Sequence, residues 1–493
     1  MSDLSATLGS QAEVDAPADP SFGFLRACFI AFLFSFAFDY RDHNILFDSE
    51  KTGGSAFQFA FLGLALASSG LAFLRGWRFL LVRPGTWMVL LWGGYIAFMI
   101  TVALLHGNDP GRIFRLIITP LLVLLGLSVT QMAACAGLRA AEAMRWVLIV
   151  ACINVLWRFT HGLLFSGLAI DEIRMEILSP AMNFLFAWVG VALVLGRRFS
   201  LWIVAVLAVP MIPSVFSITR SVFFPITASA LGSVACLLLG LAWRIYGPSH
   251  PMKKLGAIAG VGAVAVLGVV VMALAQPVVI ERWVDRMFYN GGAGAATTED
   301  LSALMRKAEA KSMLDILSKE PASFVYGRGP GASYYWDESY FPELFMVYPE
   351  DRHQFAEDIY TAGHSIWTYT LFSSGIVGIL VVLGTFFATM GLSLRAAWRN
   401  SQTVMGRWAM DAHLLFLPCV SMLCLLSESI TRNPFDERFT GVLLGFMIAL
   451  PQFFFNRAYY LEHREQEAAL APQLILTEED LPQQWQGAFP RTA

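Results

Sequence analysis

The sequence predicts an all-α, polytopic integral membrane protein with about twelve transmembrane helices and one long extracytoplasmic loop domain. Of its 493 residues, 56% are hydrophobic and only 14% are charged, whereas soluble domains carry about 25% charged residues. Aromatic residues make up 13% of the chain, so the low charge does not reflect a disordered composition. The apolar residues also gather in runs of about 20, the length of a helix that crosses a bilayer.

Twelve segments have this length and apolarity. They lie at 22–39, 55–74, 85–105, 115–136, 146–166, 180–196, 200–217, 221–243, 255–276, 365–391, 412–430 and 438–456. Residues 1–20 lack the basic region of a cleavable signal, so we expect the first apolar run to be a transmembrane helix.

The polar connections between these segments are short, with one exception, and they divide the chain into five parts. These are an N-terminal tail at 1–21, transmembrane helices one to nine at 22–276, a loop domain at 277–363, transmembrane helices ten to twelve at 364–456, and a C-terminal tail at 457–493.

Basic residues gather in alternate connections, which predicts the orientation, because Lys and Arg in short loops favour the cytoplasmic side. With both tails in the cytoplasm, the inner connections hold Arg75, Arg78, Arg83, Arg139, Arg145, Arg197, Arg198, Arg244, Lys253, Lys254, Arg395, Arg399 and Arg407. The loop domain 277–363 then lies outside, which is the periplasm if the membrane is the bacterial inner membrane.

Composition and motifs exclude several classes of function. The net charge of −3 gives no reason to expect a nucleic-acid partner. The six cysteines lie inside apolar runs without metal-ligand spacing, so we expect neither disulfides nor a metal site. The chain has no Asp-x-Asp pair and no glycine-rich nucleotide motif, which indicates that nucleotide sugars are not its substrates.

The loop domain has an ordered pattern. Thr297 and Asp300 form a potential capping box, apolar residues then recur at helical spacing, and Pro321 ends the run, which predicts an amphipathic helix of about five turns. The glycines Gly327, Gly329 and Gly331 follow in a tight turn whose exposed backbone suits substrate binding, and the aromatics after it suit either sugar rings or anchoring at the membrane surface.

Three ionisable side chains from separate parts of the chain are predicted on the outer side. Arg220 lies between two apolar spans, Arg306 lies on the loop helix, and His364 begins a span. Two arginines can neutralise a diphosphate, and a histidine can transfer a proton near neutral pH. Each also has a structural explanation: contact with lipid headgroups for Arg220, a solvated helix charge for Arg306, and a place beside a helix N-cap for His364.

The stretch from His364 to Leu380, with Gly375 and Gly378, resembles the histidine motif of the bacterial O-antigen ligase and O-antigen polymerase superfamily. The segment from Ser217 to Ser221 resembles its arginine motif, although Ser221 stands where a glycine often follows. The run from Arg306 to Gly331 resembles its loop pattern. The resemblance covers roughly residues 200–450.

The resemblance implies metal-independent, inverting glycosyl transfer from an undecaprenyl-diphosphate-linked glycan, with no cofactor. The acceptor would be a hydroxyl of lipid A core or of another lipid-linked glycan, at a site surrounded by membrane lipids. A polymerase would have a chain-length regulator as a further partner. Arg220 and Arg306 would stabilise the diphosphate, and His364 would orient or deprotonate the acceptor. Such an enzyme serves surface polysaccharide synthesis, as O-antigen, lipopolysaccharide or exopolysaccharide.

Two further residues are candidates for substrate binding. Glu428 and Arg432 lie near the outer end of the eleventh span, where they can bind acceptor or simply pair with each other at i, i+4 spacing.

Other functions remain open. A transporter or flippase for a lipid-linked or anionic substrate would have polar residues in mid-span, and Asn154, Arg158 and Asn183 fit that description. A structural subunit of an envelope assembly, or a ligase that attaches glycan to protein, are further alternatives.

Overall fold

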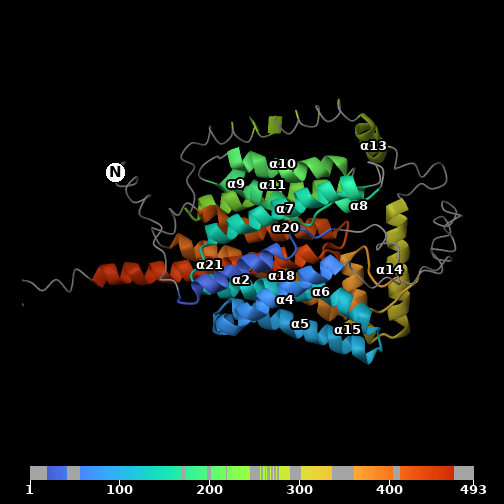
Figure 1. Cartoon of the computed structure of the whole chain (residues 1–493), viewed down its shortest axis with the longest axis horizontal. Coiled ribbons are helices and arrows are strands. Elements are labelled where there is room, and N and C mark those ends of the chain that lie inside the picture. Colours follow the sequence, from blue (N-terminus) through green and yellow to red (C-terminus); the bar gives the residue numbers. More distant parts are fainter. Residues whose placement is uncertain are drawn as a thin grey trace, which may run out of the picture.

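A computed structural model gives the architecture of the chain (Figure 1). It describes residues 19–40, 56–167, 173–196, 201–217, 219–244, a few positions between 256 and 274, 277–288, 301–335, 360–402 and 411–470. Within these ranges all the regular elements are helices, apart from an isolated β-bridge between Tyr334 and Tyr360.

Eight helical segments are long and apolar enough to cross a membrane. They contain α4 (Ala56–Gly76) with η1 (Trp77–Leu81), α5 (Gly85–Leu105), α6 (Pro110–Cys135), α7 (Ala140–Phe165), η2 (Arg220–Val222) with α11 (Phe223–Ala242), α18 (Ile366–Ser401), η5 (Ala412–Phe416) with α20 (Leu417–Ser429), and α21 (Arg438–Leu470). The all-helical membrane class is therefore supported.

Three shorter apolar helices coincide with further predicted spans: α2 (Phe22–Phe34), α9 (Ala181–Leu195) and α10 (Leu201–Phe216). The predicted span 255–276 lies largely outside the described residues. The structure thus does not confirm a count of twelve. Two internal prolines, Pro210 and Pro213, lie in the last two turns of α10, where the missing N–H groups favour an early helix end.

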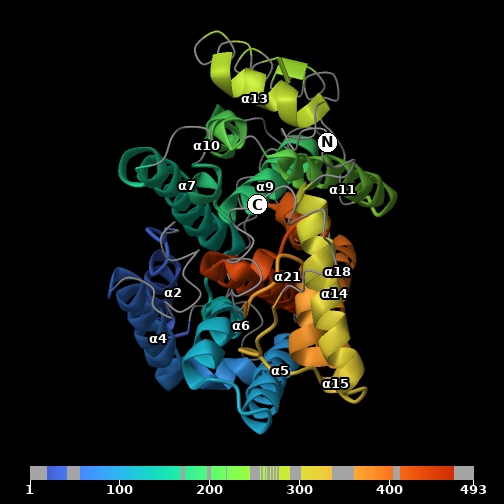
Figure 2. The same ribbon diagram turned by 90° about the vertical axis from the view of Figure 1, so that its right-hand side faces the viewer.

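Helices α6 and α21 form the centre of the bundle, and Figure 2 shows the other helices arranged around them. Their close approach depends on glycines. A Cβ on Gly445 would lie 2.6 Å from the Leu127 nitrogen, and one on Gly126 would lie 3.0 Å from the Val442 oxygen. Small residues allow helix backbones to approach in this way, which increases van der Waals contact where water provides no driving force.

The segment predicted as a loop domain contains α13 (Pro277–Phe288), α14 (Leu301–Lys319) and α15 (Ser323–Tyr326). Helix α14 runs across one end of the bundle, at the right of Figure 1 and in front in Figure 2. We call this end the loop end. Met313 and Leu317 of α14 pack with Tyr334 and Phe372 in a small apolar core, which fixes α14 against α18.

The helix predicted from residue 301 is confirmed as α14, and it ends before Pro321 as expected. The predicted capping residues Thr297 and Asp300 lie outside the described residues.

Candidate functional site

His364 lies at the loop end, between the Tyr334–Tyr360 bridge and α18. Its main-chain N–H donates to Glu309 Oε1 at 2.8 Å, and its Nδ1 lies 2.7 Å from Glu309 Oε2. Since a carboxylate only accepts hydrogen bonds, Nδ1 carries the proton and Nε2 is left for other contacts. The His364 side chain is 58% exposed, whereas that of Glu309 is 1% exposed. A buried carboxylate therefore holds an imidazole that faces outward.

The Glu309 contact raises the pKa of His364 above its ordinary value. The hydrogen bond to Glu309 is the main cause, and the charges of Glu309 and Asp436 act in the same direction. The partial removal of the imidazole from water and the positive charge of Arg306 oppose this rise in pKa. The arrangement stabilises the imidazolium that forms when His364 accepts a proton, which is the role of the carboxylate in hydrolase triads.

The main chain before His364 is held on two sides. Tyr334 exchanges main-chain hydrogen bonds with Tyr360 at 2.9 Å, and its hydroxyl donates to the Ala362 carbonyl at 2.7 Å. On the other side Asn433 Nδ2 donates to the Gly363 carbonyl at 3.3 Å. The histidine is therefore positioned by its backbone as well as by its side chain.

Arg306 lies on α14, three residues before Glu309, so both side chains project from the same face of the helix. Its charge is close enough to His364 to lower the pKa of the imidazole. Its Nε is buried and has no hydrogen-bond partner among the residues that the structure describes. A buried guanidinium N–H without a partner is costly, and an anionic ligand would satisfy it.

A short turn lies beside His364. Its helical part is η6 (Pro434–Asp436), which Asn433 begins by accepting from the Phe435 N–H at 3.1 Å. Asn433 also donates to Asp436 Oδ1 at 2.8 Å. This turn, Asn433–Asp436, brings the Asp436 charge near His364 and leads directly into α21.

Arg220 begins η2 and is exposed. The neighbouring helix α13 covers this connection: Trp283 Nε1 donates to the Val215 carbonyl at 2.7 Å, and its ring lies edge-on to Phe223 at 5.7 Å. Arg220 is thus at the surface next to the loop domain.

Next to Arg220, Ser221 and Val222 line a recess with Glu428 and Arg432 of the α20 region. Glu428 is buried and accepts hydrogen bonds from Asn183 of α9 and from Arg432. The local Glu428–Arg432 pair considered from the sequence is therefore present. Arg432 lines the recess, and the next residue, Asn433, contacts the residue before His364. One continuous segment therefore connects the recess to the His364 region.

The three glycines of the loop turn have positive φ values of 77°, 81° and 85°, at Gly327, Gly329 and Gly331. The N–H groups of Arg328 and Gly329 donate to the carbonyls of Phe372 and Ser373, both at 2.8 Å. Side chains on these glycines would meet the backbone of α5, α6 and α18. The expectation of an exposed turn is therefore wrong: Gly327, Gly329 and Gly331 are buried, and packing of the turn against the bundle accounts for glycine at these positions.

Helix α18 breaks where this turn docks. Gly375 has a φ of +63°, and a Cβ there would meet the backbone of α15. The break releases carbonyls just before Gly375 from helical hydrogen bonding, and two of them accept from the turn. The glycine that the histidine motif carries therefore has a structural role.

The structure brings His364 and Arg306 together. It places Arg220 beside the recess that Glu428 and Arg432 line. Two further residues contribute to the site and were missed from the sequence. These are Glu309 and Asn433, which hold His364 and its preceding residue. A signal for Glu309 existed in its spacing of three from Arg306. Nothing in the sequence indicated Asn433.

Within the described ranges, groups of three or more His, Cys, Asp and Glu side chains that could hold a metal ion do not occur. The available chemistry is that of a carboxylate-bound imidazole beside a guanidinium with an unsatisfied N–H.

The chain matches no protein-family model and no curated protein sequence.

Proposed function

We propose that this protein is a membrane glycosyltransferase of the O-antigen ligase or polymerase type. It would transfer a glycan from an undecaprenyl-diphosphate carrier to a sugar hydroxyl at the outer face of the bacterial inner membrane. The observation that carries the proposal is the Glu309–His364 pair, with contacts of 2.8 and 2.7 Å, beside the unsatisfied Nε of Arg306.

The proposed reaction is a single displacement. The acceptor hydroxyl gives its proton to Nε2 of His364 while its oxygen forms a bond to the anomeric carbon. The bond from that carbon to the diphosphate oxygen breaks, and the diphosphate leaves with the electron pair. Attack opposite the leaving group inverts the anomeric centre. Glu309 stabilises the resulting imidazolium, and a general base of this kind contributes on the order of 10² to 10⁴ in rate.

Arg306 would stabilise the negative charge that develops on the leaving diphosphate, because guanidinium groups bind phosphate oxygens in a fixed fork. Arg220, exposed at the start of η2, would approach the same diphosphate from the side of the recess. Positive charges that are already in place where negative charge develops favour the transition state.

The main alternative is transport of a lipid-linked or anionic substrate, because Asn154, Arg158 and Asn183 are polar residues inside apolar segments. Each has a protein partner: Asn154 donates to the Phe36 carbonyl, Arg158 pairs with Glu437, and Asn183 donates to Glu428. No observation on these residues favours a transport route over the enzyme.

The test compares surface glycan in cells that carry wild-type protein, His364→Ala or a deletion, with membrane levels of the protein measured. We expect His364→Ala to accumulate normally, match the deletion, and build up lipid-linked precursor. A matched control is His413→Ala, because His413 lies in η5 at the opposite end of α18. Normal glycan in the His364→Ala strain would contradict the proposal.

Separation of the surface glycan by size on a gel distinguishes the two activities. Single capped repeats would indicate loss of a polymerase, and long chains not attached to an acceptor would indicate loss of a ligase.

A further inference from the structure

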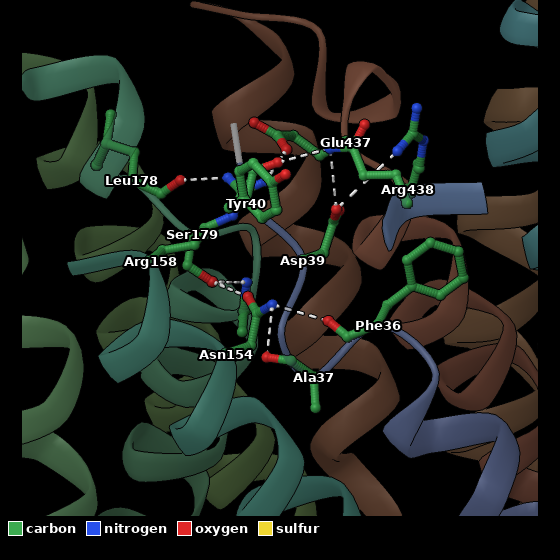
Figure 3. A network of polar contacts seen from close by, with 12 residues as sticks. Phe36, Ala37, Asp39, Tyr40, Asn154, Arg158, Leu178, Ser179, Glu437 and Arg438 are labelled. Atoms are coloured by element: carbon green, nitrogen blue, oxygen red, sulfur yellow. Dashed lines mark hydrogen bonds and ion pairs between the residues drawn. The ribbon is translucent and has the colours of Figure 1, made fainter. Parts of the chain in front are cut away.

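A buried polar cluster lies at the junction of α2, α7 and α21 (Figure 3). It consists of Asp39, Asn154, Arg158, Ser179 and Glu437, all of which are buried. Burying charged groups costs several kcal/mol each unless they are well paired. Such a cluster therefore calls for an explanation beyond general stability.

Arg158 of α7 is the centre of the cluster and is 1% exposed. Its NH1 donates to the Leu178 carbonyl at 2.7 Å, and its NH2 lies 2.6 Å from Glu437 Oε2. One guanidinium thus joins the connection before α9 to the residue that precedes α21. A lysine at this position would have a single ammonium group and lacks the fork needed for both contacts.

Asn154, one turn earlier on α7, strengthens the same junction. Its Nδ2 donates to the carbonyls of Phe36 and Ala37 at 3.0 and 3.3 Å, and its Oδ1 accepts from Ser179 Oγ at 2.6 Å. Asp39 extends the cluster, since an oxygen of its carboxylate lies 4.0 Å from Arg438 NH1. Figure 3 shows these groups facing one another from separate parts of the chain.

Both contacts of Arg158 lead to the candidate site. Glu437 directly follows the turn Asn433–Asp436, which binds the Gly363 carbonyl and brings the Asp436 charge to His364. Leu178 and Ser179 line the recess together with Ser221 and Arg432. The cluster is therefore joined to both parts of the site by main-chain neighbours.

We infer that Arg158 is a positioning residue for the proposed glycosyl transfer: through Glu437 it fixes the turn beside His364, and through the Leu178 carbonyl it fixes the edge of the recess. This inference rests on the proposed function. Buried ion pairs contribute little net stability, but they can select one arrangement of the elements that they join. A displacement of about 1 Å in a catalytic group can cost on the order of 10²-fold in rate.

The first test measures glycan transfer by purified protein in lipid vesicles for Arg158→Met, Glu437→Gln and the double variant. We expect each single variant to lose about tenfold or more in kcat with a smaller change in KM, since geometry rather than substrate contact is altered. The double variant should lose no more than the worse single variant, because both residues act through one contact. Additive losses would overturn the inference.

Arg26→Met is the matched control. Arg26 pairs with Glu142 at 2.5 Å, and this pair joins α2 and α7 at the opposite end of the bundle. The Arg26→Met variant should leave the kcat unchanged. Equal losses of kcat in Arg26→Met and Arg158→Met would show that Arg158 supports the fold in general and does not specifically position the site.

A second readout does not require enzymatic activity. Diethyl pyrocarbonate modifies neutral imidazole, so the pH dependence of His364 modification, followed by peptide mass spectrometry, reports the protonation of His364. The charges that face His364 are those of Glu309, Asp436 and Arg306. Displacement of the Asp436 turn in Arg158→Met should move the midpoint of modification to lower pH, whereas Arg26→Met should not. An unchanged midpoint in Arg158→Met would overturn the inference.

Arg158→Lys carries both measurements if Arg158→Met does not accumulate. It keeps a charge opposite Glu437 but cannot also bridge to Leu178, so we expect a reduced kcat, while the turn beside His364 and the modification midpoint should change little. In that case the midpoint shift toward lower pH is measured in Glu437→Gln, which removes the ion pair itself. A wild-type kcat in Arg158→Lys, or an unchanged midpoint in Glu437→Gln, would overturn the inference. If the wild-type protein transfers no glycan, the proposed function fails, and the modification midpoint still decides whether Arg158 positions His364.

Discussion

Glu309 and His364 are separated by 55 positions in the sequence, yet the buried Glu309 carboxylate accepts from both the main-chain N–H and the Nδ1 of His364. One residue thus fixes the location, the ring orientation and the tautomer of the histidine. This contact also connects α14 to the residues just before α18, so α14 is part of the candidate site.

Replacing Glu309 with Gln should lower the rate of transfer and move its pH dependence. The carboxylate raises the pKa of His364, so in the wild type the neutral base is lost as the pH falls through this raised pKa. The amide has no charge, the pKa of His364 falls, and the acidic limb should move to lower pH, while kcat drops by on the order of 10- to 100-fold.

The measurement is the transfer rate between about pH 5 and pH 9, the range in which a histidine titrates. Glu320→Gln is a suitable control, because Glu320 is an acidic residue at the same end that pairs with Arg328. An acidic limb that stays in place in Glu309→Gln would show that His364 does not set it.

Replacing Arg306 with Lys should reduce transfer by about tenfold, although the positive charge is kept. A lysine offers a point charge in place of the planar fork that holds two phosphate oxygens. The loss should include a higher KM for the lipid-linked donor, and Arg306→Ala should lose more. Lys307→Ala, a change at the next and more exposed position of α14, should behave as wild type. An equal loss in Lys307→Ala would indicate a general effect of charge on this helix.

Replacing Gly375 with Ala should destabilise the protein. At a φ of +63° and a ψ of −161° a residue with a Cβ is strained by about 1–3 kcal/mol, and the added methyl would also meet the backbone of α15. Gly384 lies in the same helix with no atom within 4 Å of the position of its Cβ, so Gly384→Ala should be neutral or should stabilise the helix by up to about 1 kcal/mol. Thermal unfolding in detergent compares the two, and a similar melting temperature for both would contradict this account of the helix break.

The proposed orientation can be tested with single cysteines at opposite ends of the bundle. Val325 of α15 is exposed at the loop end, and Gln402 is exposed after the far end of α18. The six native cysteines are buried or half-buried, so the wild type provides the background. A membrane-impermeant maleimide should label Val325→Cys from the periplasmic side and Gln402→Cys only after the inner membrane is opened. The reverse labelling pattern would show that the orientation in the membrane is opposite to the proposed one.

The sequence by itself determined the helical membrane class and most of the helices, because apolarity over about 20 residues is a property of each segment alone. It also located α14, since its apolar spacing and Pro321 act locally. Apolarity does not decide whether a segment shorter than a typical span crosses the membrane. Helices α9 and α10 are of this kind, and the count of twelve spans is not confirmed.

Only the tertiary structure decided which polar groups meet. Arg158 and Glu437 are 279 positions apart, and their pairing depends on how α7 packs near the start of α21. Gly375 looked like part of a motif, but its positive φ and its contact with α15 appear only once the loop turn is docked against the bundle. The physical reason is that hydropathy is summed along the chain, whereas the partner of a buried charge is selected in three dimensions by the cost of leaving that charge unpaired.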